Sequence, residues 1–222
     1  MHLPLFRFLH RNRHLLVFVA LMVVFRSSFA DWNDVPTTSM DPSIRAGDRI
    51  LVNKLAYDLR LPVLGTPLWR LGEPARGDIV VFDSAAAGLR LVKRVVGLPG
   101  DTVALRGNRL LINGQALDYA PTAGDGEGRL AIETLGALRH YVRWTAGPHR
   151  LDSFAPLTIP DDHYLMLGDN RDNSADSRVY GLVPRSELVG RAGAVAFSLD
   201  YDTWLPRRDR FFRRLDTLPD EA

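Results

Sequence analysis

The chain contains no cysteine and very little lysine. Among its 222 residues, the 28 basic side chains include only two lysines, Lys54 and Lys93. The absence of cysteine excludes a thiol nucleophile, a thiolate metal site and a disulfide framework. Because arginine keeps its proton in proteins whereas a buried lysine can lose it, each lysine is a candidate for acid–base chemistry.

Several other kinds of site are also missing. Six histidines occur, but none stands in a His-Glu-x-x-His arrangement, so the sequence argues against a zinc peptidase. The acidic run 169–176 has Arg171 at its third position and lacks the glycine of a calcium-binding loop. No glycine-rich phosphate motif is present, and a net charge of +2 is too small to suggest nucleic acid. We therefore expect no metal, no cofactor and no nucleic-acid partner.

The only membrane-like segment lies near the N-terminus. Residues 1–14 contain three arginines and no acid, residues 15–25 are uninterruptedly apolar, and acidic residues follow. This charge order predicts a cytoplasmic segment 1–14, a transmembrane helix 15–30 and an extracytoplasmic remainder. As a helix, residues 15–30 are about 24 Å long, shorter than a hydrocarbon core of about 30 Å. Taken alone, the segment also fits a cleavable signal peptide ending in Ser28-Phe29-Ala30.

Beyond residue 44 the sequence is typical of short β-strands separated by glycine, proline, asparagine and aspartate. The expected strands are 48–52, 77–82, 89–96, 102–105, 109–112, 164–167 and 189–197. No long helix is expected after residue 30. Residues 118–158 are the least regular part, and we interpret about 106–158 as a variable insertion. Segment 204–215 carries five arginines among apolar residues, which fits either a solvated basic end or contact with lipid headgroups.

Ser39 and Lys93 are the candidates for chemistry. Ser39 is flanked by threonines and a proline, so it also fits a turn residue or a helix N-cap. Leu91, Lys93 and Val95 share one face of an expected strand, where apolar surroundings would lower the pKa of the lysine. The alternative is a lysine that extends its ammonium group from an edge strand into water. A neutral lysine can activate a serine hydroxyl, as in serine–lysine variants of the serine triad.

Five motifs stand in order along the chain. They are Val35-Pro36-x-x-Ser39-Met40-x-Pro42, Gly47-Asp48-x-Ile50-Leu51-Val52, Arg76-Gly77-Asp78-Ile79-Val80-Val81-Phe82, Lys93-Arg94-Val95-Val96-Gly97-Leu98-Pro99-Gly100-Asp101, and Gly168-Asp169-Asn170-Arg171-Asp172-Asn173-Ser174-Ala175-Asp176-Ser177-Arg178. Together they resemble the bacterial type I signal peptidases, the membrane-bound serine–lysine endopeptidases of protein export. The resemblance covers most of 35–105 and 160–198.

This resemblance implies a fold and a location. The fold would be mainly β, with an antiparallel sheet or barrel as the catalytic domain at 31–222. A small variable β insertion would interrupt it, and one transmembrane helix would precede it. The protein would cross the bacterial plasma membrane once and hold its catalytic domain outside. Its partners would be signal peptides of preproteins and the phospholipid bilayer, and its oligomeric state stays open.

The resemblance also implies roles in catalysis. Ser39 would attack the scissile carbonyl, and neutral Lys93 would take the serine proton and deliver it to the leaving amine. The backbone N–H of Ser39 and the hydroxyl of Thr37 would stabilise the oxyanion. Ser174 would orient the Lys93 amine.

Other residues would have supporting roles by the same resemblance. Asp176 and Arg178 would form a structural pair, in which Arg94 could take part. The family cleaves after small residues in an Ala-x-Ala pattern, and shallow apolar pockets would receive them. The side chains expected to line these pockets are Val35, Pro36, Met40, Ile44, Leu91, Val92 and Ala175.

One position departs from the pattern, because Thr38 stands where the family commonly has glycine. If that glycine supplies unusual backbone angles, a β-branched residue would disturb the oxyanion geometry. Two alternatives to general signal peptidase function therefore remain. One is a specialised processing peptidase for a conjugation or pilus precursor. The other is a catalytically inactive, membrane-tethered binding homologue.

Overall fold

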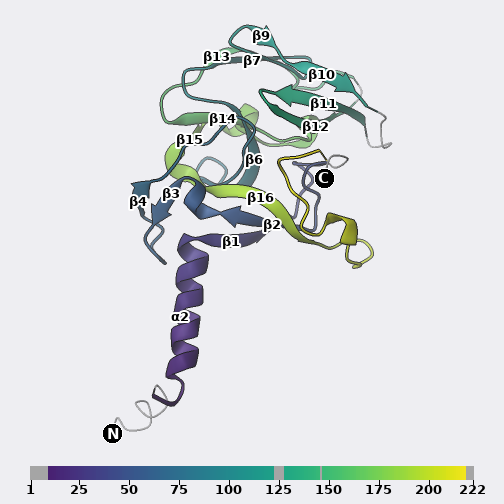
Figure 1. Cartoon of the computed structure of the whole chain (residues 1–222). Coiled ribbons are helices and arrows are strands. Elements are labelled where there is room, and N and C mark those ends of the chain that lie inside the picture. Colours follow the sequence, from purple (N-terminus) through teal and green to yellow (C-terminus); the bar gives the residue numbers. More distant parts are fainter. Residues whose placement is uncertain (1–9, 123–127, 146, 219–222) are drawn as a thin grey trace.

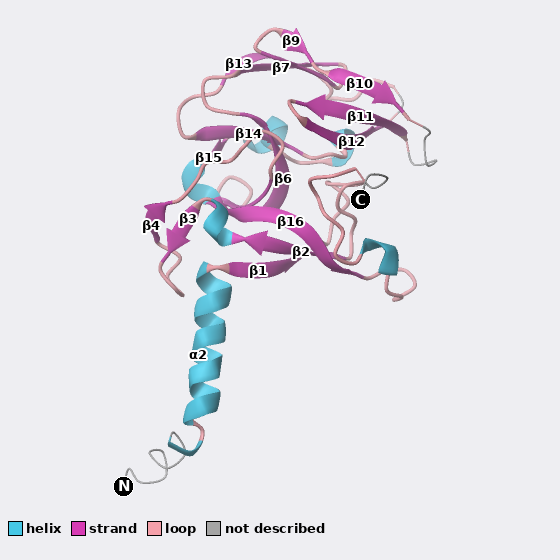
Figure 2. Cartoon of the chain, viewed as in Figure 1, coloured by secondary structure: helices cyan, strands magenta, loops and turns pink. Residues whose placement is uncertain are grey.

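The computed structural model describes residues 10–122, 128–145 and 147–218. This part of the chain consists mainly of antiparallel β-strands, and one longer helix projects from it at the N-terminal end (Figures 1 and 2). The strands are β1 Ala30–Asp34, β2 Asp48–Asn53, β3 Asp58–Arg60, β4 Pro67–Arg70, β5 Ile79–Ser84, β6 Leu89–Gly97, β7 Thr102–Arg106, β8 Arg109–Ile112, β9 Gln115–Ala116, β10 Asp118–Pro121, β11 Arg129–Leu135, β12 Leu138–Trp144, β13 Phe154–Thr158, β14 His163–Leu167, β15 Val183–Pro184 and β16 Leu188–Ser198. The helices are α2 Arg13–Ser28 and the short α3 Ser177–Tyr180, with single 3₁₀ turns at Lys54–Ala56, Arg171–Asn173, Arg185–Glu187 and Arg208–Arg210. The expected mainly β class is confirmed.

The largest sheet has seven strands in the order β1-β2-β16-β5-β6-β14-β15. Side chains cover both of its faces, and β5 shows why its sequence is almost continuously apolar. Ile79 and Val81 belong to one buried cluster, whereas Val80 and Phe82 belong to another. A strand buried on both faces needs apolar residues at every position rather than at alternate ones. The strands expected from the sequence, which are β2, β5, β6, β14 and β16 of this sheet and β7 and β8 of another, are all present, and their ends agree to within two residues.

The interpretation of 118–158 as the least regular part was wrong. This stretch contains β10, β11, β12 and β13, and β11 and β12 form a hairpin of two seven-residue strands. Polar residues hid the pattern, because Glu133 on β11 and His140 and Arg143 on β12 are buried among the apolar positions. The three-stranded sheet β10-β11-β12 lies beside the four-stranded sheet β13-β7-β8-β9 in Figure 1.

The expected transmembrane segment 15–30 is helical only in part. Helix α2 covers Arg13–Ser28, and Ala30 already begins β1. Most side chains of α2 are apolar and exposed. Within the described ranges, no helix is both long enough and apolar enough to cross a membrane.

The C-terminal end of α2 is fixed to the sheet by Lys54, which follows β2. The Lys54 ammonium donates to the carbonyl oxygens of Arg26 at 2.7 Å and Ser27 at 3.4 Å. Asp31 pairs with Arg26 at 2.7 Å and with Lys54 at 3.5 Å. The last carbonyl groups of a helix have no partner within it, so a cation placed there both satisfies them and complements the helix dipole.

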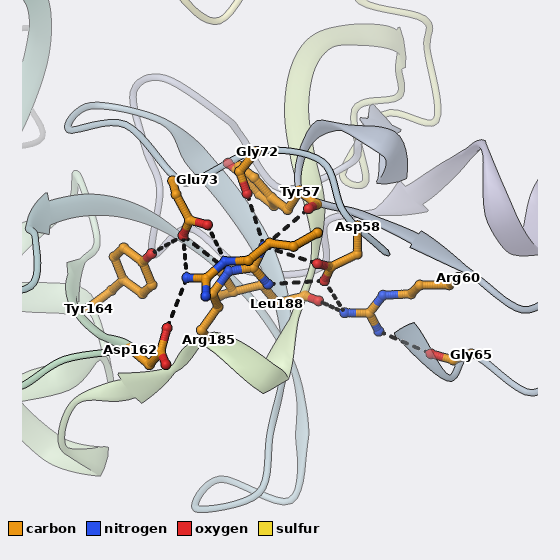
Figure 3. A network of polar contacts seen from close by, with 11 residues as sticks. Tyr57, Asp58, Arg60, Gly65, Gly72, Glu73, Asp162, Tyr164, Arg185 and Leu188 are labelled. Atoms are coloured by element: carbon orange, nitrogen blue, oxygen red, sulfur yellow. Dashed lines mark hydrogen bonds and ion pairs between the residues drawn. The ribbon is translucent and has the colours of Figure 1, made fainter. Parts of the chain in front are cut away.

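A second element, the hairpin β3–β4, stands beside α2 in Figure 1 and was not expected from the sequence. Its base is held by Arg185, which donates to both carboxylate oxygens of Asp58 and to Glu73 (Figure 3). The apolar residues in and directly after the hairpin are exposed, namely Val63, Leu64, Leu68, Trp69 and Leu71. The hairpin is therefore polar where it joins the domain and apolar where it meets solvent.

The basic segment 204–215 does not present all its arginines to solvent. Arg210 is buried and donates through Nε to Asp48 at 3.0 Å. Arg207 pairs with Asp200, and Arg214 pairs with Asp216. Arg207 and Arg210 hold this segment to residues just before and at the start of β2, whereas Arg214, Trp204, Leu205 and Phe212 are exposed.

Candidate functional site

The side chains of Ser39 and Lys93 meet inside the protein. Their Oγ and Nζ atoms lie 2.7 Å apart and are hydrogen-bonded. Ser39 is 9% exposed and Lys93 is 2% exposed. Lys93 lies on β6 with Leu91 and Val95, both of which contact the same apolar cluster. The strand alternation expected from the sequence thus places the lysine among apolar neighbours.

Burial lowers the pKa of the Lys93 amine from its ordinary value to about 8. The main cause is loss of water, which disfavours the ammonium form. The carboxylates of Asp176 and Asp169 act in the opposite direction and raise this pKa, and Arg178 lowers it slightly further. The amine is therefore far more available as a base near neutral pH than a solvated lysine.

Ser39 occupies a tight turn between β1 and β2. The backbone N–H of Asp41 donates to the carbonyl oxygen of Thr38 at 3.0 Å, so Ser39 is the second residue of a four-residue turn. The hydroxyl of Thr37 lies 3.4 Å from Ser39 Oγ. Two threonines and a proline thus surround a serine that is oriented by backbone hydrogen bonds.

Thr38 fits this turn without strain. It is not among the residues with positive φ, so the backbone at this position does not require glycine. Its Oγ1 accepts a hydrogen bond of 2.9 Å from Asn173 Nδ2, and its carbonyl oxygen accepts one of 3.1 Å from Asn170 Nδ2. Thr38 thus makes contacts of its own with the neighbouring loop.

That neighbouring loop, residues 168–178, carries Ser174, Asp176 and Arg178. The Ser174 hydroxyl is buried and has no hydrogen-bond partner within the described part of the chain, so its expected bond to Lys93 is not formed in this structure. Asp176 and Arg178 form a buried ion pair through two contacts of 2.9 and 2.8 Å. Asp176 also accepts the Gly168 N–H at 3.0 Å. The pair therefore shapes the loop beside Lys93.

Arg94 pairs with another carboxylate, that of Asp169. Two hydrogen bonds of 2.8 and 2.7 Å join its guanidinium to both oxygens, and both side chains are almost fully buried. Its third nitrogen donates to the carbonyl oxygen of Gly77 at 2.8 Å. Arg94 thus connects β6 to the start of the 168–178 loop, separately from Asp176 and Arg178.

The residues expected to line the substrate pockets fall into two groups. Val35, Met40, Ile44 and Val92 belong to one apolar cluster. Leu91 lies on the opposite face of β6, where it lines a cavity of about 220 Å³ together with residues such as Asp176 and Tyr180. Pro36 and Ala175 are exposed near Ser39 and Ser174. The structure therefore separates Leu91 from the others, because neighbouring residues of a strand point to opposite faces.

Several residues that hold the turn had no predicted role. Asn170 and Asn173 lie within a quoted motif, yet only the structure shows that both contact Thr38. Asp41 pairs at 2.9 Å with Arg143 of β12, in the stretch that had seemed irregular. Among the described residues, no group of three acidic or histidine side chains is placed to hold a metal ion.

Comparisons with known proteins identify relatives of this chain. A family model described as signal peptidase, peptidase S26, matches residues 9–197. A signal peptidase I of Pseudomonas aeruginosa is 40% identical over 195 residues, which cover 80% of this chain and 68% of that protein. A signal peptidase I of Bacillus licheniformis is 32% identical over 184 residues, which cover 82% of this chain and 85% of that protein. A solved signal peptidase I from Enterococcus faecalis V583 is 31% identical and covers 54% of this chain and 96% of its own, with a TM-score of 0.36.

Proposed function

This chain belongs to the signal peptidase family, peptidase S26, and we propose that Ser39 is its nucleophile and Lys93 its general base. It is a serine endopeptidase that removes signal peptides from preproteins. One observation carries the assignment of the two residues. A serine hydroxyl and a lysine amine lie 2.7 Å apart in a buried site, and the pKa of that lysine is lowered to about 8.

In the proposed reaction, the neutral amine of Lys93 takes the proton of Ser39 as Oγ attacks the scissile carbonyl carbon. The resulting oxyanion accepts hydrogen bonds from the Ser39 backbone N–H and from the Thr37 hydroxyl. Lys93 then gives its proton to the leaving amine, and the peptide bond breaks to leave an acyl-enzyme on Ser39. A water molecule then gives a proton to Lys93 as its oxygen attacks the ester, and Lys93 returns that proton to Ser39 Oγ as the acyl group leaves as a carboxylic acid.

The remaining site residues support this chemistry. Among the described residues, the buried Ser174 hydroxyl has no hydrogen-bond partner, and an unpaired buried hydroxyl is costly, so a rotated lysine amine would find an acceptor there. The Asp176–Arg178 pair fixes the loop that carries Ser174. Small apolar side chains of the substrate would contact Val35, Pro36, Met40, Ile44, Val92 and Ala175, with Leu91 on the other side of β6.

The test is cleavage of a preprotein with an Ala-x-Ala site by the purified full-length chain in detergent. The wild-type protein should give a product with the mass expected for cleavage after the second alanine. The Ser39→Ala and Lys93→Ala variants should give no product. A folding control is needed, so the variants are compared by thermal melting. Turnover by a well-folded Lys93→Ala protein would reject Lys93 as the base.

A panel of unrelated preproteins addresses the substrate range. A general signal peptidase should cut most of them, and a specialised processing peptidase should ignore most. A chain that cuts none, and whose Ser39 is not labelled by an acylating serine-directed inhibitor, would instead be a binding homologue. The contacts of Thr38 favour an active enzyme, because this residue does not distort the turn.

For the location, we propose that residues 15–30 anchor the chain in the bacterial plasma membrane, with residues 1–14 in the cytoplasm and 31–222 outside. The exposed apolar side chains of α2 and the charge order around it support this. The exposed apolar side chains of the hairpin β3–β4, next to the end of α2, support contact with the lipid surface as well. Trp69, which is 67% exposed, is of a residue type enriched at the membrane interface.

The absence of cysteine makes this topology easy to test. Single cysteines at position 2 and at the exposed position 115 can be probed in intact cells with a membrane-impermeant maleimide. We expect labelling of Gln115→Cys once the outer membrane or cell wall is permeable, and labelling of His2→Cys only after lysis. The reverse pattern would overturn the proposed orientation.

A further inference from the structure

We propose that Arg143, on β12 of the three-stranded sheet, is a positioning residue that holds the nucleophile turn through a buried ion pair with Asp41. This inference rests on the proposed function, because it concerns the turn that carries Ser39. It assigns a role in catalysis to the insertion at about 106–158, for which the sequence predicted no role.

The turn makes Ser39 sensitive to the position of Asp41. The two residues are separated by Met40 only, and the hydrogen bond from the Asp41 N–H to the Thr38 carbonyl oxygen closes the ring that contains Ser39. A displacement of Asp41 is therefore transmitted to the nucleophile and to one of the two proposed oxyanion donors.

Arg143 lies closer to the Asp41 carboxylate than Arg45 does, and it is better shielded from water. The Nη2 atom of Arg143 lies 2.9 Å from Asp41 Oδ2, and the two side chains are only 4% and 9% exposed. Arg45 approaches the same carboxylate at 3.5 Å, but its side chain is 48% exposed. An ion pair shielded from water is held more firmly than an exposed one, and removal of one partner leaves a buried charge uncompensated.

The backbone of Arg143 holds the other side of the nucleophile turn. Its N–H donates to the carbonyl oxygen of Asp169 at 2.8 Å, and the residue forms a β-bridge with Asn170. Asn170 in turn donates its backbone N–H to the carbonyl oxygen of Ser39 at 3.2 Å. Contacts thus run from Arg143 through Asp41 to Ser39, and from Ser39 through Asn170 back to Arg143.

This arrangement predicts a specific kinetic effect. Asp41 is not among the groups that shift the pKa of Lys93, so loss of the pair should leave the base unchanged. Met40 lies between Ser39 and Asp41, but its side chain is fully buried in the apolar cluster, so the substrate pockets should keep their shape. The loss should therefore appear in kcat, through misplacement of Ser39, and neither in KM nor in the pH at which Lys93 protonates.

The test compares Arg143→Gln and Asp41→Asn with a matched control in the full-length chain. The control is Arg185→Gln, because Arg185 also makes a buried ion pair, with Asp58, at the base of the β3–β4 hairpin (Figure 3). For either variant of the Asp41–Arg143 pair we expect kcat for preprotein cleavage to fall by about 10- to 100-fold. KM should change by no more than about two-fold, and the acid limb of the pH profile should stay in place. The control should lose stability with kcat changed by no more than about two-fold, measured below its melting temperature.

Two further variants keep the test decisive. Arg143→Lys retains the charge and should recover part of kcat, and it replaces Arg143→Gln if that variant does not fold. In the double variant Asp41→Asn, Arg143→Gln the losses of kcat should be less than additive, because both changes break the shared Asp41–Arg143 pair.

The inference is overturned if Arg143→Gln and Arg185→Gln lose the same fraction of kcat, or if the acid limb of the Arg143→Gln profile moves. Failure of the proposed function is recognised separately, because wild type would then not cut the preprotein or Ser39→Ala would cut it equally well. Either of those results rejects both proposals.

Discussion

The hydroxyl of Thr38 accepts a hydrogen bond of 2.9 Å from the side-chain amide of Asn173. The residue next to the nucleophile is thereby joined to the loop that carries Ser174, Asp176 and Arg178. A glycine at position 38 could not make this contact. The turn that carries Ser39 and the loop that carries Ser174 are thus connected through the side chain of Thr38.

We therefore expect Thr38→Gly to lower activity. A net contribution of about 0.5–1.5 kcal/mol for one hydrogen bond corresponds to a loss of about 2- to 10-fold in kcat if the contact is kept in the transition state. Thr38→Ser retains the hydroxyl and should stay near wild type. Asn173→Ala should lose as much as Thr38→Gly, and the pair of changes should not be additive. A gain in activity from Thr38→Gly would show that the threonine hinders the site.

Activity should follow the protonation state of Lys93. Since the pKa of this amine is about 8, the base is mostly neutral above that pH and increasingly charged below it. Single-turnover cleavage measured from pH 6 to 9 should fall by about ten-fold for each pH unit below about 7 and level off above 8. A rate that does not change across this range would exclude Lys93 as the titrating base.

The same shift predicts that Lys93 destabilises the folded protein. The unfolded lysine has a pKa near 10.5 and the folded one about 8, so the unfolded state binds more protons between these values. The contribution of Lys93 to the free energy of unfolding therefore rises as the pH increases from about 8 to 10.5, and it is lowest below pH 8. Lys93→Met, of similar volume, should be inactive but more stable at pH 7, by roughly 3 kcal/mol. Thermal melting at pH 7 and pH 10 checks this, and the advantage should shrink at the higher pH.

The buried pair of Glu133 and Arg171 should contribute strongly to the integrity of the β11–β12 hairpin. Arg171 Nη2 lies 2.7 Å and 2.8 Å from the two carboxylate oxygens of Glu133, and both side chains are almost fully buried. Glu133→Gln would leave a buried guanidinium without its counter-charge, which we expect to cost about 3–5 kcal/mol. Asp83→Asn, which breaks an exposed pair with Arg90, should cost less than about 1 kcal/mol. Urea unfolding of both variants provides the comparison.

The β3–β4 hairpin should enter the lipid interface when the protein is in a bilayer. Leu64→Cys at its tip and Gln115→Cys on the far strand β9 can each carry a fluorophore, because the chain has no other cysteine. On reconstitution into vesicles, the label at 64 should become shielded from an aqueous quencher, and the label at 115 should not. Equal quenching at both sites would show that the hairpin stays in water.

The sequence was sufficient to predict five of the seven strands of the large sheet, and its resemblance to a family predicted the meeting of Ser39 with Lys93. Both depend on local patterns, namely strand alternation and short motifs. The β11–β12 hairpin could not be predicted in this way. Its buried Glu133, His140 and Arg143 look like surface residues until their partners on distant segments are known.

The pocket residues illustrate a related limit. Leu91 and Val92 were assigned together on the basis of resemblance, yet strand geometry sends adjacent side chains to opposite faces. Only the position of the Ser39 turn relative to β6 shows that Val92 packs with Met40, whereas Leu91 lies on the other face of the strand. Similarly, the pairing of Arg94 with Asp169 depends on how the 168–178 loop approaches β6, which no single motif contains.

The hydrogen bonds of Lys54 to the end of α2 have one more consequence. They join the helix directly to the sheet, with Phe29 as the only residue between α2 and β1, so the height of Ser39 above the helix end is set by rigid elements. With α2 held in a membrane, the enzyme becomes a molecular ruler. It would cut bonds presented at one distance from the lipid, and scissile sites moved along a substrate by a few residues would escape it even with their alanines intact.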